Sequence, residues 1–282
     1  MTEQTPRDGR RAPEVVAIVG VGLIGGSFAL ALRATGFAGR IIGVSSPEAI
    51  RVAIERGIVD EGLPLADAAS IADLIYLARP IEGILSAIDE IDSHVKPGTL
   101  ITDAGSTKSA ICARAAEKIR RGRFIGGHPM AGKEARGAGE AEASLFLGRP
   151  YILTSRCAEL EQLIASFGAR LVFISAEEHD ALVALTSHLP QLISTALAAS
   201  IGTQPEAARV AGPAAMDLTR LALSPYEIWR DIFATNAANV DAALGVFIAK
   251  LEGLRTELRG LRIQQEFEDA AAAARALRES RT

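Results

Sequence analysis

One histidine in this sequence stands where a proton acceptor could be held in place. His128 follows Gly126 and Gly127 and precedes Pro129. Glycines before it and a proline after it indicate a constrained loop at the end of a strand, and imidazole changes its protonation state near neutral pH. The residues alone leave two interpretations equally open, a catalytic base and a histidine satisfied within the core.

Three further polar clusters could form parts of a site: Asp103–Lys108 (DAGSTK), Ser187–Gln191 (SHLPQ) and Asp217–Arg220 (DLTR). The first follows an apolar run, so it is expected at the carboxyl end of a strand, where open α/β sheets bind ligands. A helix cap is the alternative there. His188 in the second cluster could equally be a core histidine beside a proline kink. Arg220 in the third could clamp a planar carboxylate or form a surface ion pair.

A glycine-rich turn predicts a dinucleotide site. The β-branched run Val15–Val19 reads as a buried strand and leads directly into a GxGxxG that precedes a helical segment. In such a turn the first glycine permits the tight bend, the second admits a pyrophosphate, and the third lets helix and strand pack closely. A turn that serves packing alone is the alternative. The expected cofactor-binding residues of this turn are Gly20, Gly22, Leu23, Ile24 and Gly25.

The next expected strand, Arg40–Ser45, bears on which cofactor is used. NAD-preferring units place an acidic residue at this tip to bind the ribose hydroxyls, but here Ser45 and Ser46 follow without a carboxylate. The two hydroxyls could bind a 2′-phosphate, so NADP is favoured over NAD. The serines could instead only cap the following helix. Arg79, after the third expected strand, either contacts the cofactor or lies on the surface.

The elements that must position these residues fall into two types. Over residues 14–175, strands alternate with helical segments, which predicts parallel βαβ units in a Rossmann-like, doubly wound α/β sheet. Over residues 176–262, alanine and leucine recur at helical spacing without a convincing strand, which predicts an all-α domain. Such a domain often buries its apolar stripe against a second copy of the chain. Residues 1–13 are expected to be a disordered tail and residues 263–282 a helical tail.

Composition narrows the class of protein. The chain has 282 residues, 49% of them hydrophobic, and a net charge of −4, which argues against a nucleic-acid-binding protein. Its two cysteines lack metal-ligand spacing, so no metal is expected. No signal peptide is evident, and no apolar run was found to approach the ~20 residues that span a bilayer. These features predict a cytoplasmic protein without a membrane partner.

Taken together, six motifs resemble the prephenate/arogenate dehydrogenase family of tyrosine biosynthesis. The resemblance runs from about Val15 to Leu258, and its motifs occur in order at compatible spacing. They are VGLIGGS (Val21–Ser27), DAGSTK (Asp103–Lys108), GGHPMAGKEARG (Gly126–Gly137), SHLP (Ser187–Pro190), DLTR (Asp217–Arg220) and IWRDI (Ile228–Ile232). The resemblance implies a nucleotide-binding domain followed by a helical dimerisation domain. It also implies NAD(P)-dependent oxidative decarboxylation of prephenate or arogenate, in a homodimer.

The resemblance also implies roles for individual residues. His128 would be the catalytic histidine that hydrogen-bonds the substrate's 4-hydroxyl, and Ser106 would orient that hydroxyl or the nicotinamide. Arg220 would bind a substrate carboxylate, His188 would line the pocket, and Glu134 would lie near its mouth. The chain departs from the family where many relatives read SHLPH, because Gln191 replaces the second histidine.

Two other classes of function remain open at this stage. β-Hydroxyacid dehydrogenases and imine reductases also have a Rossmann-like domain followed by a helical domain. The former need a catalytic lysine on a helix of the second domain, and the segment Ala181–Val246 contains no lysine. A non-catalytic NADP-sensing module would keep the glycines without needing a positioned His128. Within this family, no single residue of the sequence predicts whether prephenate or arogenate is the preferred substrate. The two differ at one side-chain carbon, which bears a keto group in prephenate and an ammonium group in arogenate.

Overall fold

The structure is a computed structural model that describes residues 13–133, 135–260 and 262–279. It divides into two compact units, which are described separately. The first comprises Met1–Val183 with Leu223–Asn236, and the second Ala184–Ala222 with Ala237–Thr282. Residues 176–183 and 223–236 therefore belong to the same unit as the residues expected to form the α/β sheet.

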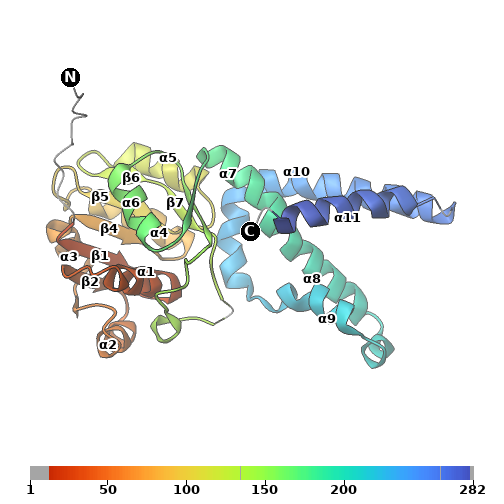
Figure 1. Ribbon diagram of the computed structural model, residues 1–282, viewed down its shortest axis with the longest axis horizontal. Helices are drawn as coiled ribbons and strands as arrows, with labels where there is room; N and C mark the ends of the chain where they lie inside the picture. Colours follow the sequence, from red (N-terminus) through yellow and green to blue (C-terminus); the bar gives the residue numbers. More distant parts are fainter. Residues whose placement is uncertain (1–12, 134, 261, 280–282) are drawn as a thin grey trace, which may run out of the picture. The chain divides into compact units, whose positions relative to one another are not determined.

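A six-stranded parallel sheet forms the centre of the first unit, in the order β3-β2-β1-β4-β5-β6 (Figure 1). Its central strands are runs of valine, isoleucine and leucine that are buried on both faces, as expected for a covered parallel sheet. The strands are β1 (Val15–Val19), β2 (Arg40–Val44), β3 (Glu61–Gly62), β4 (Leu74–Leu77), β5 (Leu100–Asp103) and β6 (Arg123–Ile125).

Helices cover both faces of this sheet, which confirms the expected doubly wound fold. On one face Phe28 stacks on Tyr76 with ring centroids 3.8 Å apart, and on the other Ile84, Ile88 and Ile91 are fully buried. The helices of this unit are α1 (Leu23–Ala34), α2 (Pro47–Glu55), α3 (Leu65–Ile71), α4 (Ile81–Ile91), α5 (Ser109–Lys118), α6 (Ala158–Ser166) and α7 (Ala176–Val183).

A second, three-stranded sheet departs from the prediction of a single continuous sheet. Strand β7 (Gly127–Pro129) pairs antiparallel with β8 (Pro150–Leu153), which pairs parallel with β9 (Arg170–Phe173). The chain changes sheets at Gly126, where an added Cβ would lie 2.7 Å from the Cys112 sulfur and 2.8 Å from the Thr154 hydroxyl oxygen. His128 therefore lies in a short strand rather than in the loop that the sequence suggested.

The second unit is helical, as predicted. It contains α8 (Leu189–Gly202), α9 (Pro213–Thr219), α11 (Gln264–Glu279) and the part of α10 (Tyr226–Arg259) that follows Asn236. A π-helical turn, Ala184–His188, lies between α7 and α8 along the chain. Helix α10 also departs from helical geometry at Asn236, where φ is −133° and ψ is 21°.

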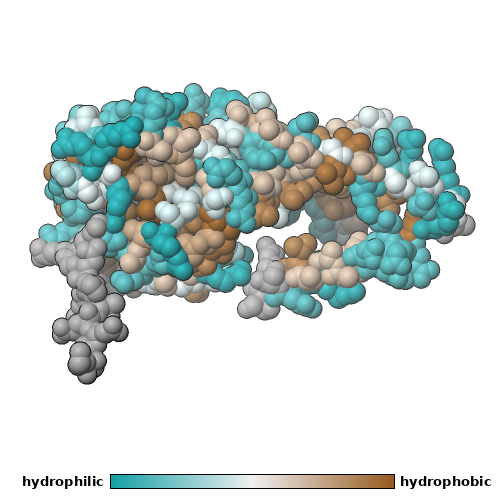
Figure 2. Space-filling model, turned by 90° about the horizontal axis from the view of Figure 1, so that it is seen from above, coloured by the Kyte–Doolittle hydropathy of each residue, from teal (hydrophilic) through white to brown (hydrophobic). Residues whose placement is uncertain are grey.

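Apolar side chains are exposed on the helices of the second unit (Figure 2). Two helical stretches, Ala176–Gly202 and Tyr226–Arg259, are long and apolar enough to cross a membrane by length and composition alone, with 33% and 22% of their most apolar window buried. By this measure the expectation that no run approaches this length was wrong, both for α10 and for the stretch in which the π-helical turn joins α7 to α8. Helices that pack against another subunit have the same properties.

Candidate active site

Four chain segments predicted to bind ligands meet at one edge of the parallel sheet. The backbone N–H of Gly20, after β1, donates to Val44 O at the end of β2 over 2.8 Å, and Ala78 N donates to Val19 O over 2.7 Å. Ala104 N, after β5, donates to Leu77 O over 2.9 Å. The carboxyl ends of β1, β2, β4 and β5 are thus joined side by side, which is where open α/β sheets bind ligands.

The glycine turn has the geometry that a dinucleotide requires. Gly20 has a φ of +100°, and an added Cβ would lie 2.5 Å from Ala78 O. A Cβ on Gly25 would lie 2.1 Å from Gly20 O, whereas one on Gly22 would meet no described atom within 4 Å. Helix α1 begins here without a side-chain cap or an acidic residue in its first turn. Its N–H groups and the open side of Gly22 therefore fit a pyrophosphate.

The tip of β2 presents the two predicted serines, but one of them also has a structural role. Ser45 is exposed, while the Ser46 hydroxyl oxygen accepts a hydrogen bond from Ala49 N over 3.3 Å and so caps α2. Arg51, one turn further, is bound by Glu48 at 2.7 Å and Glu55 at 2.6 Å. A 2′-phosphate would have to compete with these carboxylates for Arg51.

Arg79 is half-buried beside the glycine turn. Its Cγ lies 3.0 Å from the position that a Cβ on Gly20 would take, and its Cβ lies 3.0 Å from the corresponding position on Gly83. The side chain therefore runs along the turn rather than away from it, which is compatible with its predicted contact to the cofactor.

A buried ion pair connects the end of β5 to the strand that carries His128. Asp103 and Lys108 form a salt bridge with both side chains fully buried. Asp103 also accepts hydrogen bonds from Gly105 N at 2.8 Å and Gly127 N at 3.0 Å, and Lys108 Nζ donates to Gly127 O at 2.8 Å. The backbone just before His128 is thus held by both charges. Ser106 lies half-buried in the loop that this pair closes.

His128 contacts a buried histidine–aspartate pair. Its Nδ1 lies 2.8 Å from His179 Nε2, and His179 Nδ1 lies 2.8 Å from Asp180 Oδ1. His179 is fully buried and Asp180 nearly so, while His128 is half-buried. The three side chains form a continuous chain of hydrogen bonds that ends at the predicted catalytic histidine.

Backbone groups fix the aspartate at the far end of this chain. Asp180 accepts hydrogen bonds from Lys108 N at 2.7 Å and Ser109 N at 2.8 Å, at the start of α5. Burial alone would raise the pKa of Asp180, but the hydrogen bonds from His179 and these two N–H groups together hold that pKa below its usual value. Asp180 is therefore a carboxylate at neutral pH.

His179 and Asp180 were not predicted as site residues, although a signal was present. The buried positions of α7 are Ala176, His179, Asp180 and Val183, spaced at i, i+3, i+4 and i+7. Two of these core-facing positions carry titratable side chains, and buried polar groups need partners. Asn236, whose side-chain nitrogen donates to Asp180 O over 2.8 Å, gave no comparable signal.

The remaining predicted substrate-binding residues belong to the second unit or lie outside the described residues. His188 is buried in the π-helical turn, and Arg220 begins a short 3₁₀ helix, Arg220–Leu223. Gln191 Nε2 donates to Leu221 O over 2.9 Å, so α8 is held to the turn that follows Arg220. Glu134 lies outside the described residues.

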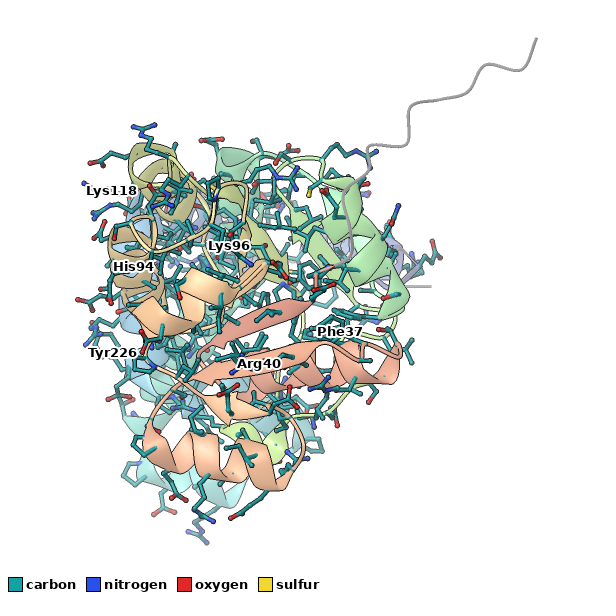
Figure 3. All side chains as sticks on the ribbon, turned by 90° about the vertical axis from the view of Figure 1, so that its left-hand side faces the viewer. Phe37, Arg40, His94, Lys96, Lys118 and Tyr226 are labelled. Carbon is teal, nitrogen blue, oxygen red and sulfur yellow. The ribbon has the colours of Figure 1, made fainter. Side chains whose placement is uncertain are left out.

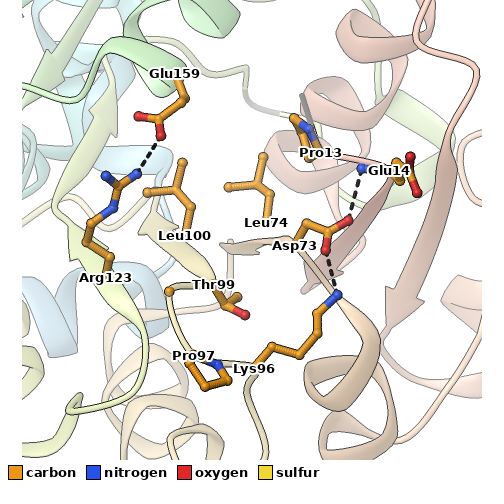
Figure 4. A pocket seen from close by; sticks show the side chains of 11 residues that line it. Pro13, Glu14, Asp73, Leu74, Lys96, Pro97, Thr99, Leu100, Arg123 and Glu159 are labelled. Atoms are coloured by element: carbon orange, nitrogen blue, oxygen red, sulfur yellow. Dashed lines mark hydrogen bonds and ion pairs between the residues drawn. The ribbon is translucent and has the colours of Figure 1, made fainter. Parts of the chain in front are cut away.

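A separate pocket of about 400 Å³ lies at the opposite edge of the sheet. It is lined by residues just before β1, β4 and β5 and at the start of β6, and Figure 3 shows Arg40 and Lys96 on this side. Four of its charged side chains form two ion pairs, Lys96 with Asp73 at 2.5 Å and Arg123 with Glu159 at 3.1 Å (Figure 4). The pocket is thus remote from the glycine turn and from His128.

The first unit defines a class of protein. A parallel sheet, a glycine turn shaped for a pyrophosphate and a histidine supported by buried polar groups at the same sheet edge are the parts of an NAD(P)-dependent dehydrogenase. In the described residues, no group of three or more histidine, cysteine or acidic side chains could hold a metal ion.

Comparison with known proteins identifies the family. Residues 28–171 match the model of the prephenate dehydrogenase nucleotide-binding domain, and residues 175–273 match that of the prephenate dehydrogenase dimerization domain. The chain therefore belongs to the prephenate dehydrogenase family. This confirms the predicted family, the fold and the class of enzyme.

Individual relatives agree with this assignment. The prephenate dehydrogenase of Lactococcus lactis is 35% identical over 228 residues, which cover 78% of this chain and 64% of that enzyme. The structure of A. aeolicus prephenate dehydrogenase with hydroxyphenyl propionate and NAD+ aligns with a TM-score of 0.86 at 30% identity, covering 94% of this chain and 98% of that one. Synechocystis arogenate dehydrogenase aligns with a TM-score of 0.80 at 29% identity, covering 95% and 100%.

Proposed function

We propose that this protein catalyses the NAD(P)-dependent oxidative decarboxylation of prephenate or arogenate, giving 4-hydroxyphenylpyruvate or tyrosine. The observation that carries the proposal is the contact of His128 with buried His179, at the sheet edge that also bears the glycine turn. The relatives named above act on these two substrates, and five of the six motifs lie within the residues that match the two family models.

The proposed chemistry needs a proton acceptor and precise positioning. A nicotinamide cofactor held by the turn Gly20–Gly25 would supply the acceptor for the hydride that leaves C4 of the substrate's cyclohexadiene ring. His128 accepts the proton of the 4-hydroxyl, so that a carbonyl forms at C4. The ring carboxylate then leaves as carbon dioxide, its bonding electrons complete the aromatic ring, and the carbonyl oxygen regains a proton to become the phenol. Most of the driving force comes from aromatisation, so the protein has mainly to orient the reacting groups.

The other predicted residues complete this arrangement. Ser106, in the loop closed by the Asp103–Lys108 pair, orients the hydroxyl or the nicotinamide. Arg220 binds a carboxylate of the substrate, as a planar guanidinium does well. His188 lines the substrate pocket, and Glu134 lies near its mouth.

For the cofactor we propose NADP as the preferred form. The turn Gly20–Gly25 would hold the pyrophosphate, with Arg79 beside it. Ser45, exposed at the tip of β2, would bind the 2′-phosphate, where the strand bears no carboxylate to repel it. Ser46 and Arg51 would join it only by giving up their present partners.

We also propose that the protein acts as a cytoplasmic homodimer. The match to a dimerization domain and the exposed apolar side chains of α10 support an interface formed by the helical unit.

A four-way assay tests the activity. Purified protein is mixed with prephenate or arogenate and with NAD or NADP, and the absorbance of the reduced nicotinamide is followed at about 340 nm. Activity with NADP alone would support the role of Ser45, whereas activity with NAD alone would overturn the cofactor proposal. A folded protein that binds cofactor but is inactive in all four mixtures would refute the proposed reaction.

Replacing His128 by asparagine separates an enzyme from a cofactor-sensing module. We expect His128→Asn to lower kcat by about 100-fold or more, because a positioned general base contributes on this scale. Cofactor affinity, measured by fluorescence titration, should stay within about twofold. His94→Asn is the matched control, since His94 is exposed at the other side of the sheet (Figure 3). Equal kcat values for the two variants would contradict the catalytic role.

A further inference from the structure

We propose that His179 and Asp180 are positioning residues that fix the tautomer and orientation of His128, so that its Nε2 is the atom that accepts the substrate proton. The proposal rests on the proposed function and deepens it. Neither residue was expected from the sequence, and both are buried behind His128 in α7.

The tautomers follow from the hydrogen bonds in three steps. Asp180 is ionised, so its carboxylate can only accept, and His179 Nδ1 must carry a hydrogen. A neutral His179 then has Nε2 as its acceptor, so His128 Nδ1 must carry the hydrogen shared between the two rings. In a neutral His128, Nε2 is therefore the nitrogen with the lone pair. This is the form that a proton acceptor needs.

Several elements of the first unit hold Asp180 in place. The N–H groups of Lys108 and Ser109 bind its two carboxylate oxygens at the start of α5, where the helix dipole also favours a negative charge. Asn236, at the break in α10, donates to Asp180 O over 2.8 Å. The position of the carboxylate is thus set by α5, α7 and α10 together, and His179 transmits it to His128.

The charges around this group favour a cation on His128 during the reaction. Asp103 and Lys108 neutralise each other, and burial raises the pKa of the nearby Cys112 thiol to about 11, so that thiol is uncharged at neutral pH. Asp180 remains as a buried negative charge. Two hydrogen bonds, one on each side of His179, connect it to the His128 ring. When His128 accepts the hydroxyl proton, the resulting imidazolium is stabilised through His179 by this carboxylate.

Two substitutions of His179 separate positioning from packing. A glutamine places its amide oxygen near the position of Nε2 and can still accept from His128 Nδ1. An asparagine places its amide nitrogen near Nδ1 and keeps the bond to Asp180, but it cannot reach His128. We expect kcat of His179→Gln to stay within about tenfold of the wild type and that of His179→Asn to fall by about 100-fold or more.

The same measurements include readouts that a purely structural role would not change. In Asp180→Asn the amide oxygen can take the place of Oδ1, which accepts from both His179 Nδ1 and Lys108 N, but the negative charge is lost. We therefore expect kcat to fall by about tenfold with unchanged cofactor affinity, because the imidazolium that forms on His128 is less stabilised. In the pH dependence of kcat/KM for this variant, the acidic limb should move to lower pH by about one unit or less. The reason is that the variant lacks the negative charge that favours the imidazolium form of His128. Thermal melting of each variant reports whether it is folded.

The outcomes distinguish the two proposals. Wild-type protein that is inactive in the four-way assay would refute the proposed reaction. An active wild type with equal kcat values for His179→Asn and His179→Gln, or an Asp180→Asn variant with unchanged kcat and pH profile, would refute the positioning role alone. ¹⁵N NMR of histidine-labelled wild-type protein is an independent test, in which we expect His128 Nε2 to be unprotonated at pH 8.

Discussion

At the scale of single residues, Asp180 links catalysis to stability. Its carboxylate is nearly fully buried and accepts hydrogen bonds from His179 and two backbone N–H groups. An asparagine at this position can accept fewer of these bonds, and its amide hydrogens would face N–H donors. Even a substitution that preserves the size of the side chain therefore lowers the stability of the protein at this position, because buried N–H donors lose their acceptor.

We therefore expect Asp180→Asn to lower the free energy of unfolding by about 1–3 kcal/mol at neutral pH. The folded-state pKa of Asp180 lies below its usual value, so its contribution is complete above about pH 4 and is lost as the pH falls through the folded-state pKa. The difference between wild type and variant should accordingly shrink in acid. Urea unfolding at pH 7 and pH 3 measures both values, with the exposed Asp67→Asn as the control. A difference that is constant with pH would contradict this linkage.

At the scale of elements, the glycine turn offers two substitutions with opposite consequences. A methyl group on Gly22 meets no described atom within 4 Å, so Gly22→Ala should fold with nearly wild-type stability but obstruct the pyrophosphate. A methyl group on Gly25 would lie 2.1 Å from Gly20 O, so Gly25→Ala should destabilise the protein by about 1–3 kcal/mol. Thermal melting and cofactor titration of the two variants measure these effects. Loss of stability in Gly22→Ala with unchanged cofactor affinity would contradict this interpretation.

The sequence predicted the elements that have a strong local signal. Buried β-branched runs and the GxGxxG led to β1, β2, β4 and α1, and the helical spacing led to the second unit. It predicted strands close to β8 and β9 but not β7, and it did not predict that the three form a separate sheet, because the pairing partners are distant in the chain. The break in α10 at Asn236 was not predicted either, since the contact made there, a hydrogen bond to Asp180 O, is tertiary and leaves no local pattern.

The site shows the same division between local and tertiary information. His128 could be selected from its glycine and proline neighbours, and the roles of Ser106, Arg220, His188 and Glu134 remain predictions from the resemblance. The support behind His128 depends on α7 packing against α5, which a residue pattern does not specify. Only the polar residues on the buried face of α7 indicated that such a support was present.

At the scale of the whole molecule, the exposed apolar side chains of α10 predict how the protein assembles. Val246 is 70% exposed in the single chain. If this helix forms the dimer interface, Val246→Glu buries a charge against the second subunit and should shift the protein towards the monomer. Sedimentation velocity measures the change, and Ile54→Glu in α2 is the control. An unchanged sedimentation coefficient would place the interface elsewhere, and flotation with phospholipid vesicles would test a membrane location.

The buried pair of Asp103 and Lys108 limits how this protein can change over evolutionary time. Replacing either residue alone leaves an unpaired charge in the interior, at a cost of about 3–5 kcal/mol, which is much of the stability of an ordinary domain. Exchanging both for apolar residues removes the two charges together, but it takes their hydrogen-bond partners from Gly105 N, Gly127 N and Gly127 O, so this route is costly too. The two positions are therefore coupled, and we expect them to change together or not at all, whereas an exposed residue such as Ser45 can vary alone.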